Sequence, residues 1–222
     1  MGRFGPLGGV ARRLRRWRAR RYWERRWRQP DYAPAWRGRD VSREIVAAVN
    51  DGWFARGSRA LDIGCGEGEV VSWLAEQGFP VVGIDISAAA VARARKRYGE
   101  TPGRLEFRQL DVCARDPTGG PFSVLVDRGC FHTIADRDVA EYARRVGTAS
   151  RSGARLLLFV KAFRQGGEFG QPEERARLVA RIESALSRHF VLERVAETYL
   201  DPHGGAQPDA ALPGLVFWLT RR

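Results

Sequence analysis

Short apolar runs alternate with longer amphipathic segments along the chain from residue 59 onward. The apolar runs are rich in β-branched residues and predict five strands, at 59–63, 80–85, 104–110, 122–127 and 154–161. The amphipathic segments between them predict helices near 69–77, 87–98 and 136–150. Strands that alternate with helices form βαβ units, so this pattern predicts a mainly parallel sheet with helices on both faces.

The end of the chain departs from this alternation. A further helix is predicted at about 173–188, and two strands follow at 190–199 and 215–221. No helix-length segment separates these two strands, so we expect them to pair antiparallel. The sheet would then end in a hairpin.

The N-terminal segment predicts two more helices. Residues 10–28 are good helix formers with tryptophans at helical spacings, but the apolar stripe is broken at Arg20 and Arg21. We therefore expect a frayed or two-piece helix that ends before Pro30. Asp40 is the expected N-cap of the second helix, which reaches about residue 50 and carries an apolar face of Val41, Ile45, Val46 and Val49.

Composition narrows the class of protein. Hydrophobic residues make up 44% of the 222 residues and aromatic residues 10%, which is enough for a substantial packed core. The chain has no run of about 18 apolar residues to span a membrane, and no apolar run long enough for a signal peptide. The cysteines form no CxxC pair, and the histidines lack metal-site spacing. We expect a reduced, cytoplasmic protein of bacterial type without a metal site.

The net charge of +12 is concentrated in one arm. Residues 1–28 hold eleven arginines and one acid, Glu24, so this arm carries +10 and the rest of the chain only +2. Three interpretations are open: a lid over a ligand that uses Trp23, Trp27 and Trp36 with the arginines in solvent, an RNA-binding arm, or a basic helix that lies on a membrane or a partner. Residues 1–40 are predicted to form this arm and a cap helix, and residues 41–222 the main domain.

A glycine-rich turn, GCGEGE at 64–69, follows the first predicted strand. Glycines at 64, 66 and 68 let the backbone turn sharply and approach a ligand closely. A dinucleotide-binding turn needs a glycine at position 69, where Glu69 stands instead. An acidic residue at the start of this helix argues against a bound pyrophosphate.

Carboxylates end three successive predicted strands, at Asp62, Asp85 and Asp111. Asp85 follows Gly66 by 19 residues, a spacing at which its carboxylate can accept both hydroxyls of a ribose. Asp111 can accept from the amino group of an adenine, and Val112 can offer its backbone N–H. Together with the glycine-rich turn, these residues predict a nucleoside-binding site.

Residues 61–87, LDIGCGEGEVVSWLAEQGFPVVGIDIS, resemble the glycine-rich motif and acidic strand end of class I S-adenosylmethionine-dependent methyltransferases. The resemblance implies an α/β fold with a Rossmann-like, seven-stranded doubly wound sheet in the order 3-2-1-4-5-7-6, strand 7 antiparallel, and an N-terminal helical cap. It implies S-adenosylmethionine as the cofactor. The residues expected around its methionine part are Asp62, Gly64, Cys65, Gly66 and Gly68.

The same resemblance implies roles at the adenosine end. Asp85 would hold the ribose, Ile86 would pack on the adenine, and Asp111 and Val112 would read the adenine edge. The cap expected over the cofactor is the tryptophan-containing segment 22–40, which resembles the cap of thiopurine-methyltransferase-like proteins and includes Trp36.

The segment DRGCFH at 127–132 would pass the methyl group of the cofactor. It lacks the Asn/Asp-Pro-Pro-aromatic motif of enzymes that methylate nucleobase amines and is more similar to small-molecule methyltransferases. Asp127 and Arg128 would contact the cofactor. His132 is either a general base with a pKa near neutrality or a packed histidine, and Asp127 suits the cofactor's ammonium group better than a substrate proton. Cys130 is expected to be a small buried residue.

Two loops are expected to form walls of the acceptor site, at 163–171 and 200–214. Their candidate substrate contacts, with one from the fourth strand end, are Phe131, Phe163, Phe169 and His203. The sequence thus predicts in-line methyl transfer to a small-molecule acceptor, with a thiol favoured over a hydroxyl or an amine. The alternatives are an RNA-directed methyltransferase or RNA-binding protein that uses the basic arm, and a protein that binds S-adenosylmethionine without transferring its methyl group.

Overall fold

The computed structural model of the chain describes residues 6–34, 41–162, 171–200 and 212–222. Within these ranges seven strands form a single sheet, in the order β3-β2-β1-β4-β5-β7-β6. The strands are β1 (Ala60–Ile63), β2 (Val81–Asp85), β3 (Leu105–Gln109), β4 (Phe122–Arg128), β5 (Ser150–Lys161), β6 (Phe190–Tyr199) and β7 (Pro213–Arg221). Strands β1 to β5 pair parallel, and β7 runs antiparallel between β5 and β6. The predicted sheet order and the antiparallel final pair are confirmed.

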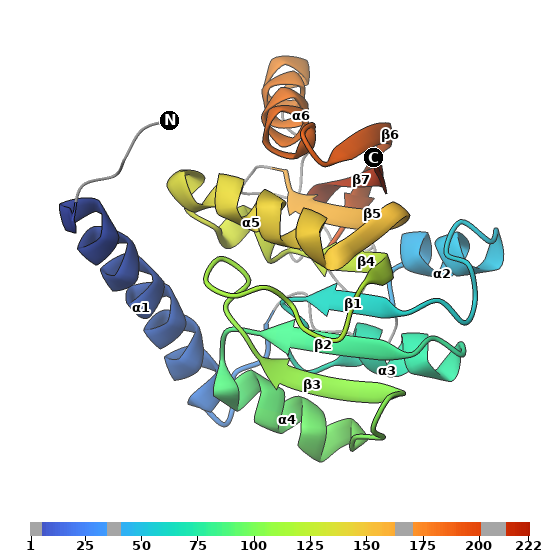
Figure 1. Cartoon of the computed structure of the whole chain (residues 1–222), viewed down its shortest axis with the longest axis horizontal. Helices are drawn as coiled ribbons and strands as arrows, with labels where there is room; N and C mark the ends of the chain where they lie inside the picture. The colour runs from blue at the N-terminus through green and yellow to red at the C-terminus, as the bar shows by residue number, and fades with distance from the viewer. Residues whose placement is uncertain (1–5, 35–40, 163–170, 201–211) are drawn as a thin grey trace.

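Helices cover both faces of this sheet (Figure 1). One apolar core lies under α2 (Arg43–Asn50), α3 (Glu69–Glu76) and α4 (Ala88–Tyr98). A second core, on the opposite face, lies under α5 (Asp136–Ala149) and α6 (Pro172–Leu186). Every residue of β1 and β2 is buried, because side chains on both faces of these central strands meet a helix layer. The doubly wound arrangement is confirmed.

The N-terminal helix α1 (Pro6–Arg28) is continuous, so the expected break at Arg20 and Arg21 is wrong. Arginine and alanine are strong helix formers, and the backbone hydrogen bonds of a helix do not require an unbroken apolar stripe. Both arginines are exposed, and Arg21 lies over the exposed Trp17 ring of the same helix. None of the helices in the described ranges has the combined length and apolar character that crossing a lipid bilayer requires.

The second helix begins later than expected. Ser42, with an extended ψ of 140°, precedes the first residue of α2, whereas Asp40 lies outside the described residues. The apolar face is largely as predicted, because Ile45 and Val49 are buried. Glu44 is buried on the same helix and accepts a hydrogen bond of 2.7 Å from the Thr198 hydroxyl.

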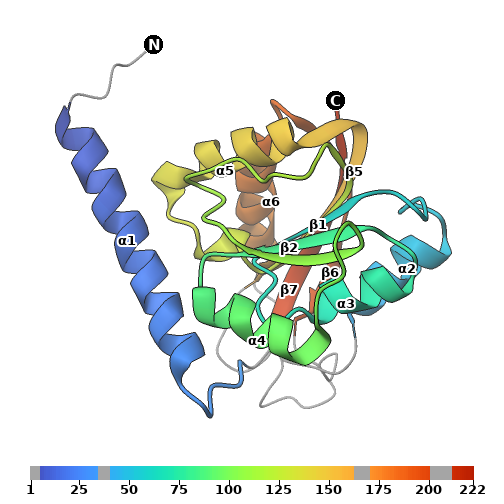
Figure 2. The same ribbon diagram turned by 60° about the horizontal axis from the view of Figure 1, so that its bottom comes forward.

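α1 lies across the edge of the sheet at which the parallel strands end (Figure 1, Figure 2). Near its C-terminal end, Glu24 accepts hydrogen bonds from the Ser87 hydroxyl (2.8 Å) and the Ala89 N–H (3.2 Å) at the start of α4. Arg93 of α4 donates to the carbonyls of Gln29 and Tyr32, just beyond α1. These contacts fix one end of α1 on the helix layer that contains α4.

The other half of α1 reaches the opposite helix layer. Arg15 and Arg16 form ion pairs with Asp138 of α5, at 3.7 and 3.9 Å. α1 therefore bridges the two faces of the sheet and closes over the ends of its central strands.

Candidate functional site

A cavity of about 360 Å³ lies between α1 and the carboxyl ends of the parallel strands. Its floor comes from the segments that follow β1, β2, β3 and β4, and its roof from one side of α1. In open α/β sheets, ligands bind in the crevice at the carboxyl ends of the strands. The expected site residues that line this cavity are Gly64, Gly66, Asp85, Ile86, Asp111, Val112, Arg128 and His132.

The glycine-rich turn forms one wall of the cavity and the floor of a smaller hollow beside it. This hollow, about 40 Å³ in volume, is bordered by Asp62, Gly64, Cys65, Gly66 and Arg128, with Trp27 above them. A Cβ atom at position 66 would lie 3.3 Å from the Trp27 ring, so glycine allows this close approach of α1. Burial holds the pKa of Asp62 well above its usual range, and the neighbouring charge of Asp127 adds to this effect.

Gly68 has a packing role in the structure, whereas the sequence analysis expected it around the methionine part of the cofactor. It borders neither hollow within the described part of the chain, and a Cβ atom there would lie 2.6 Å from the Phe107 ring. Its φ of +88° also lies in the left-handed region. Gly68 therefore lets α3 start close to β3.

Asp85 is held at the end of β2 by the backbone around it. Its Oδ1 accepts from the Ser87 N–H at 2.8 Å, and its Oδ2 accepts from the Gly66 N–H at 3.0 Å. Each carboxylate oxygen has a second lone pair, so both oxygens can accept one further hydrogen bond from a ligand in the cavity. Burial raises the pKa of Asp85 to about 6, against the lowering effect of these two hydrogen bonds.

The segment after β3 supplies the next part of the floor. Asp111 Oδ1 accepts from the Cys113 N–H at 2.8 Å, which fixes the turn, and Val112 is buried beside it. Ile86, from the end of β2, lines the same part of the cavity. A flat base could lie against Ile86 with its polar edge toward Asp111.

Asp127 does not line either hollow among the described residues. It is fully buried, and its carboxylate accepts from the backbone N–H groups of Gly129 (3.1 Å), Cys130 (2.7 Å) and Phe131 (3.1 Å) and from the Tyr142 hydroxyl (2.7 Å). Burial raises its pKa to about 6. Because these donors surround both oxygens, this geometry does not match the contact with the cofactor or substrate that the sequence led us to expect.

His132 lies at the cavity, and its pKa does not fit the first of its two alternatives, a general base with a pKa near neutrality. Burial and the nearby Lys161 ammonium lower the pKa of His132 to about 4. Its Nδ1 accepts from the backbone N–H of Lys161 at 3.4 Å, so the neutral ring carries its proton on Nε2. In this state His132 presents a donor rather than a base.

Phe131, Cys130 and Arg128 complete the turn after β4. Phe131 is fully buried and packs edge-to-face on Tyr142, with the two ring centroids 5.2 Å apart. It is therefore a core residue and does not form the expected wall of the acceptor site. Cys130 lines the cavity, and burial raises the pKa of its thiol well above its usual range. Arg128 borders both hollows and donates to the Leu200 carbonyl at 2.9 Å.

Four expected site residues lie outside the described residues, namely Trp36, Phe163, Phe169 and His203. The described residues that border their segments do reach the cavity. Lys161 at the end of β5 lines it, and so do Leu200 and Leu212 on either side of the last long loop. The predicted position of the two loops stays a prediction.

Sequence reasoning missed the N-terminal half of the roof. Arg15, Ala19, Trp23 and Trp27 line the cavity at a spacing of four residues, and Arg16 lines it beside them. Residues four apart lie on one side of a helix, so extending the spacing of Trp23 and Trp27 backward would have found Ala19 and Arg15. No sequence pattern indicated Asp138, because its ion-pair partners Arg15 and Arg16 lie more than 100 residues away in the chain.

Comparisons with known proteins agree with this site. A methyltransferase domain model matches residues 60–153. An uncharacterized methyltransferase of Schizosaccharomyces pombe is 32% identical over 103 residues, which are 46% of this chain and 70% of that protein. Thiopurine S-methyltransferase of Vibrio cholerae is 28% identical over 189 residues, covering 78% of this chain and 84% of that protein.

Solved structures share the fold. A structure from work on the conversion of a disulfide bond into a thioacetal group during echinomycin biosynthesis matches with a TM-score of 0.72 and 20% identity, covering 91% of this chain and 92% of that chain. Magnesium protoporphyrin IX methyltransferase from Synechocystis PCC 6803 matches with a TM-score of 0.65 and 17% identity, covering 93% and 99%. By its motif, its sheet order and these relatives, the chain belongs to the class I S-adenosylmethionine-dependent methyltransferases, and S-adenosylmethionine is its cofactor.

Proposed function

We propose that this enzyme transfers the methyl group of S-adenosylmethionine to the sulfur of a small-molecule thiol. The sulfonium group of the cofactor supplies a methyl group already activated for in-line displacement. The protein must then hold the cofactor, align the acceptor and keep out water. The likeness to a thiopurine S-methyltransferase over 84% of that protein's length supports both a small acceptor and a sulfur nucleophile.

The cofactor-binding residues follow from where polar groups meet the cavity. We assign the ribose hydroxyls to the open lone pairs of Asp85 and the adenine face to Ile86. Asp111 and Val112 take the adenine edge. Asp62, Cys65 and the glycines at 64 and 66 surround the methionine part, where the Arg128 guanidinium suits a carboxylate.

The state of His132 is the observation that favours a thiol over a hydroxyl as the acceptor. An alcohol needs a base to remove its proton, whereas a thiol ionises near neutral pH without one. With Nδ1 already bonded and a pKa of about 4, His132 cannot take that proton in its present arrangement. Its Nε2–H can instead help to orient an anionic sulfur.

A matched acceptor series tests this proposal. Thiophenol, phenol and aniline share one ring and differ only in the nucleophilic atom. Each is incubated with the protein and isotope-labelled S-adenosylmethionine, and the methylated product is identified by mass. We expect the thiol to be methylated fastest, with a rate that rises with pH as the thiol ionises. Faster methylation of phenol or aniline would contradict the thiol assignment.

A further inference from the structure

The outer side of α1 carries an exposed apolar stripe. Its members Val10, Leu14 and Trp17 are 58%, 51% and 52% exposed. They follow one another at spacings of four and three residues, so they lie on one side of the helix. Ala19 and Trp23, which line the cavity, lie on another side. A helix that covers a protein usually has polar residues on its outer side, so packing within this chain does not explain the stripe.

Exposed apolar side chains of large size gather on this helix. Among the described residues, the only others of this class are Tyr22, also on α1, and Val191 of β6. Scattered single apolar residues are ordinary on protein surfaces, whereas a contiguous set marks a place where something binds. The stripe is therefore a candidate interaction surface.

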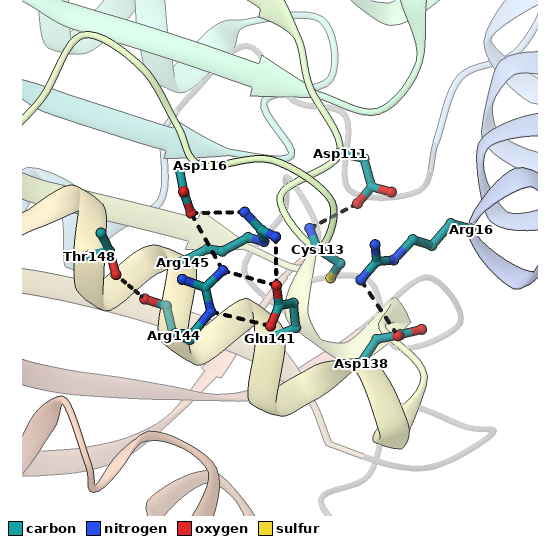
Figure 3. A network of polar contacts seen from close by, with 9 residues as sticks. All are labelled: Arg16, Asp111, Cys113, Asp116, Asp138, Glu141, Arg144, Arg145 and Thr148. Atoms are coloured by element: carbon teal, nitrogen blue, oxygen red, sulfur yellow. Dashed lines mark hydrogen bonds and ion pairs between the residues drawn. The ribbon is translucent and has the colours of Figure 1, made fainter. Parts of the chain in front are cut away.

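The opposing contacts of α1 fix which side of it faces outward. Figure 3 shows Arg16 reaching from α1 to Asp138 of α5. At the other end of the helix, Glu24 accepts a hydrogen bond from the Ser87 hydroxyl at the start of α4. In Figures 1 and 2, α1 runs along the margin of the molecule. A partner can therefore reach the stripe while these contacts stay in place.

Charge limits the kind of partner. On the helix, Arg13 and Arg20 flank the stripe on one side and Arg18 and Arg25 on the other, and all four are exposed. The helix contains one acid, Glu24, whose carboxylate is already bonded to α4. Such a surface attracts an anionic partner and repels a second copy of itself.

The apolar stripe separates the two main anionic partners. A nucleic acid would use the arginines for its phosphates and aromatic rings for its bases, but it offers nothing to bury Val10 and Leu14. The Trp17 ring is also covered on one face by the Arg21 guanidinium, 4.7 Å from the ring centroid. A bilayer with anionic lipids takes both parts, because apolar side chains enter the boundary between headgroups and acyl chains while arginines reach the phosphates.

We propose that the outer side of α1 docks this enzyme on the surface of an anionic phospholipid bilayer, with Val10, Leu14 and Trp17 inserted at the headgroup level. The inference does not depend on the identity of the methyl acceptor. The residues of α1 that line the cavity lie on another side of the helix, so docking leaves them free to cover the cofactor.

Vesicle binding by the full-length protein tests the proposal. The protein is mixed with phosphatidylcholine vesicles, or with vesicles that also contain phosphatidylglycerol, and sedimentation gives the partition constant. We expect binding to the anionic vesicles that weakens as salt is raised, because salt screens exposed charges. Vesicles of phosphatidylcholine alone should bind much less protein.

The first variants test the apolar part. Leu14→Gln removes an apolar side chain and keeps both the charge and the helix propensity of the position. It should lower the partition constant on anionic vesicles roughly tenfold or more, and Trp17→Ala should lower it as well. The matched control is Val191→Gln, at an exposed valine of the edge strand β6, and it should bind vesicles as the wild type does.

The second variant tests the charged part. Arg18→Gln combined with Arg25→Gln removes two flanking charges, so binding to anionic vesicles should fall roughly tenfold or more and depend less on salt. The matched control combines Arg151→Gln with Arg188→Gln, two exposed arginines at the start of β5 and just before β6. All these variants should keep the wild-type affinity for S-adenosylhomocysteine, which shows that the fold is intact.

Several results would overturn the proposal. Wild-type protein that binds neither kind of vesicle, or both equally, would contradict it, and so would unchanged vesicle binding by both Leu14→Gln and Trp17→Ala. Gel shifts of polyuridine that depend on Arg18 and Arg25, without vesicle binding, would identify a nucleic acid as the partner. A dimer in light scattering that Leu14→Gln dissociates would identify a second copy of the chain instead.

Discussion

Asp85 on β2 and Asp127 on β4 lie on the two strands that flank β1. Burial raises the pKa of both carboxyl groups to about 6, yet their surroundings give them different roles. Each oxygen of Asp85 accepts one backbone hydrogen bond and keeps a lone pair for a ligand. The oxygens of Asp127 are surrounded by three backbone N–H groups and the Tyr142 hydroxyl. At this scale the role of an aspartate follows from how many donors already surround it.

The raised pKa of Asp85 predicts a pH dependence of cofactor binding. Ionised Asp85 accepts from the ribose hydroxyls, and protonation below pH 6 removes that charge, so the affinity for S-adenosylhomocysteine should fall as pH is lowered from 7 to 5. Without ligand the sign is opposite: the raised pKa favours protonated Asp85, so its contribution to folding stability is lost as pH rises through about 6. Calorimetric titration across this range measures the binding effect.

The control for this prediction is Asp85→Asn, which keeps the shape and removes the titration. Its affinity should be lower than that of the wild type at pH 7 and nearly constant between pH 5 and 7. An equally steep pH profile in the variant would show that another group controls binding.

Tyr142 should contribute to stability through Asp127. Tyr142→Phe removes a buried donor from a buried carboxylate, so the free energy of unfolding should fall by about 1–3 kcal/mol. Tyr98→Phe is the matched control, because Tyr98 is only partly buried, and surface changes of this kind stay within about 0.5 kcal/mol. Urea unfolding of both variants checks this, and equal stability of the two would contradict the role given to Asp127.

At the scale of elements, the sequence predicted the sheet well and α1 poorly. The strands were predictable because apolar runs and glycine-rich turns are local signals, and the residues at the ends of β1, β2 and β3 follow from them. The path of α1 depends on Ser87, Arg93 and Asp138, which are distant in sequence and leave no periodic trace in the helix. The orientation of the Asp127 side chain could not be predicted from the sequence either, because backbone N–H groups of the turn after β4 determine it.

We expect cofactor affinity to depend on Trp27 and not on Trp17. Trp27 is 5% exposed and lies over the glycine-rich turn, whereas Trp17, on the same helix, is 52% exposed. We expect Trp27→Ala to weaken S-adenosylhomocysteine binding at least tenfold, because the roof over the methionine part is lost. Trp17→Ala should bind as the wild type does. Parallel titrations check the pair, and equal affinities in the two variants would mean that α1 does not cover the cofactor.

At the scale of the whole molecule, α1 converts an open sheet edge into an enclosed site. Its contacts join α4 on one face to α5 on the other, so the cavity below it is bounded by both helix layers. Enclosure excludes water and strengthens the polar contacts inside. Fold class, cofactor and a helical cap over the cofactor were predictable from the sequence. The way α1 joins both helix layers was not, because it arises from contacts between elements far apart in the chain.

The crystal structure of the complex with S-adenosylhomocysteine tests the central claim most directly. We expect the ribose hydroxyls on Asp85, the adenine against Ile86 with its polar edge toward Asp111, and α1 closed over the ligand with Trp27 above the glycine-rich turn. A ligand bound elsewhere, or bound at this edge with α1 displaced from α5, would contradict the account.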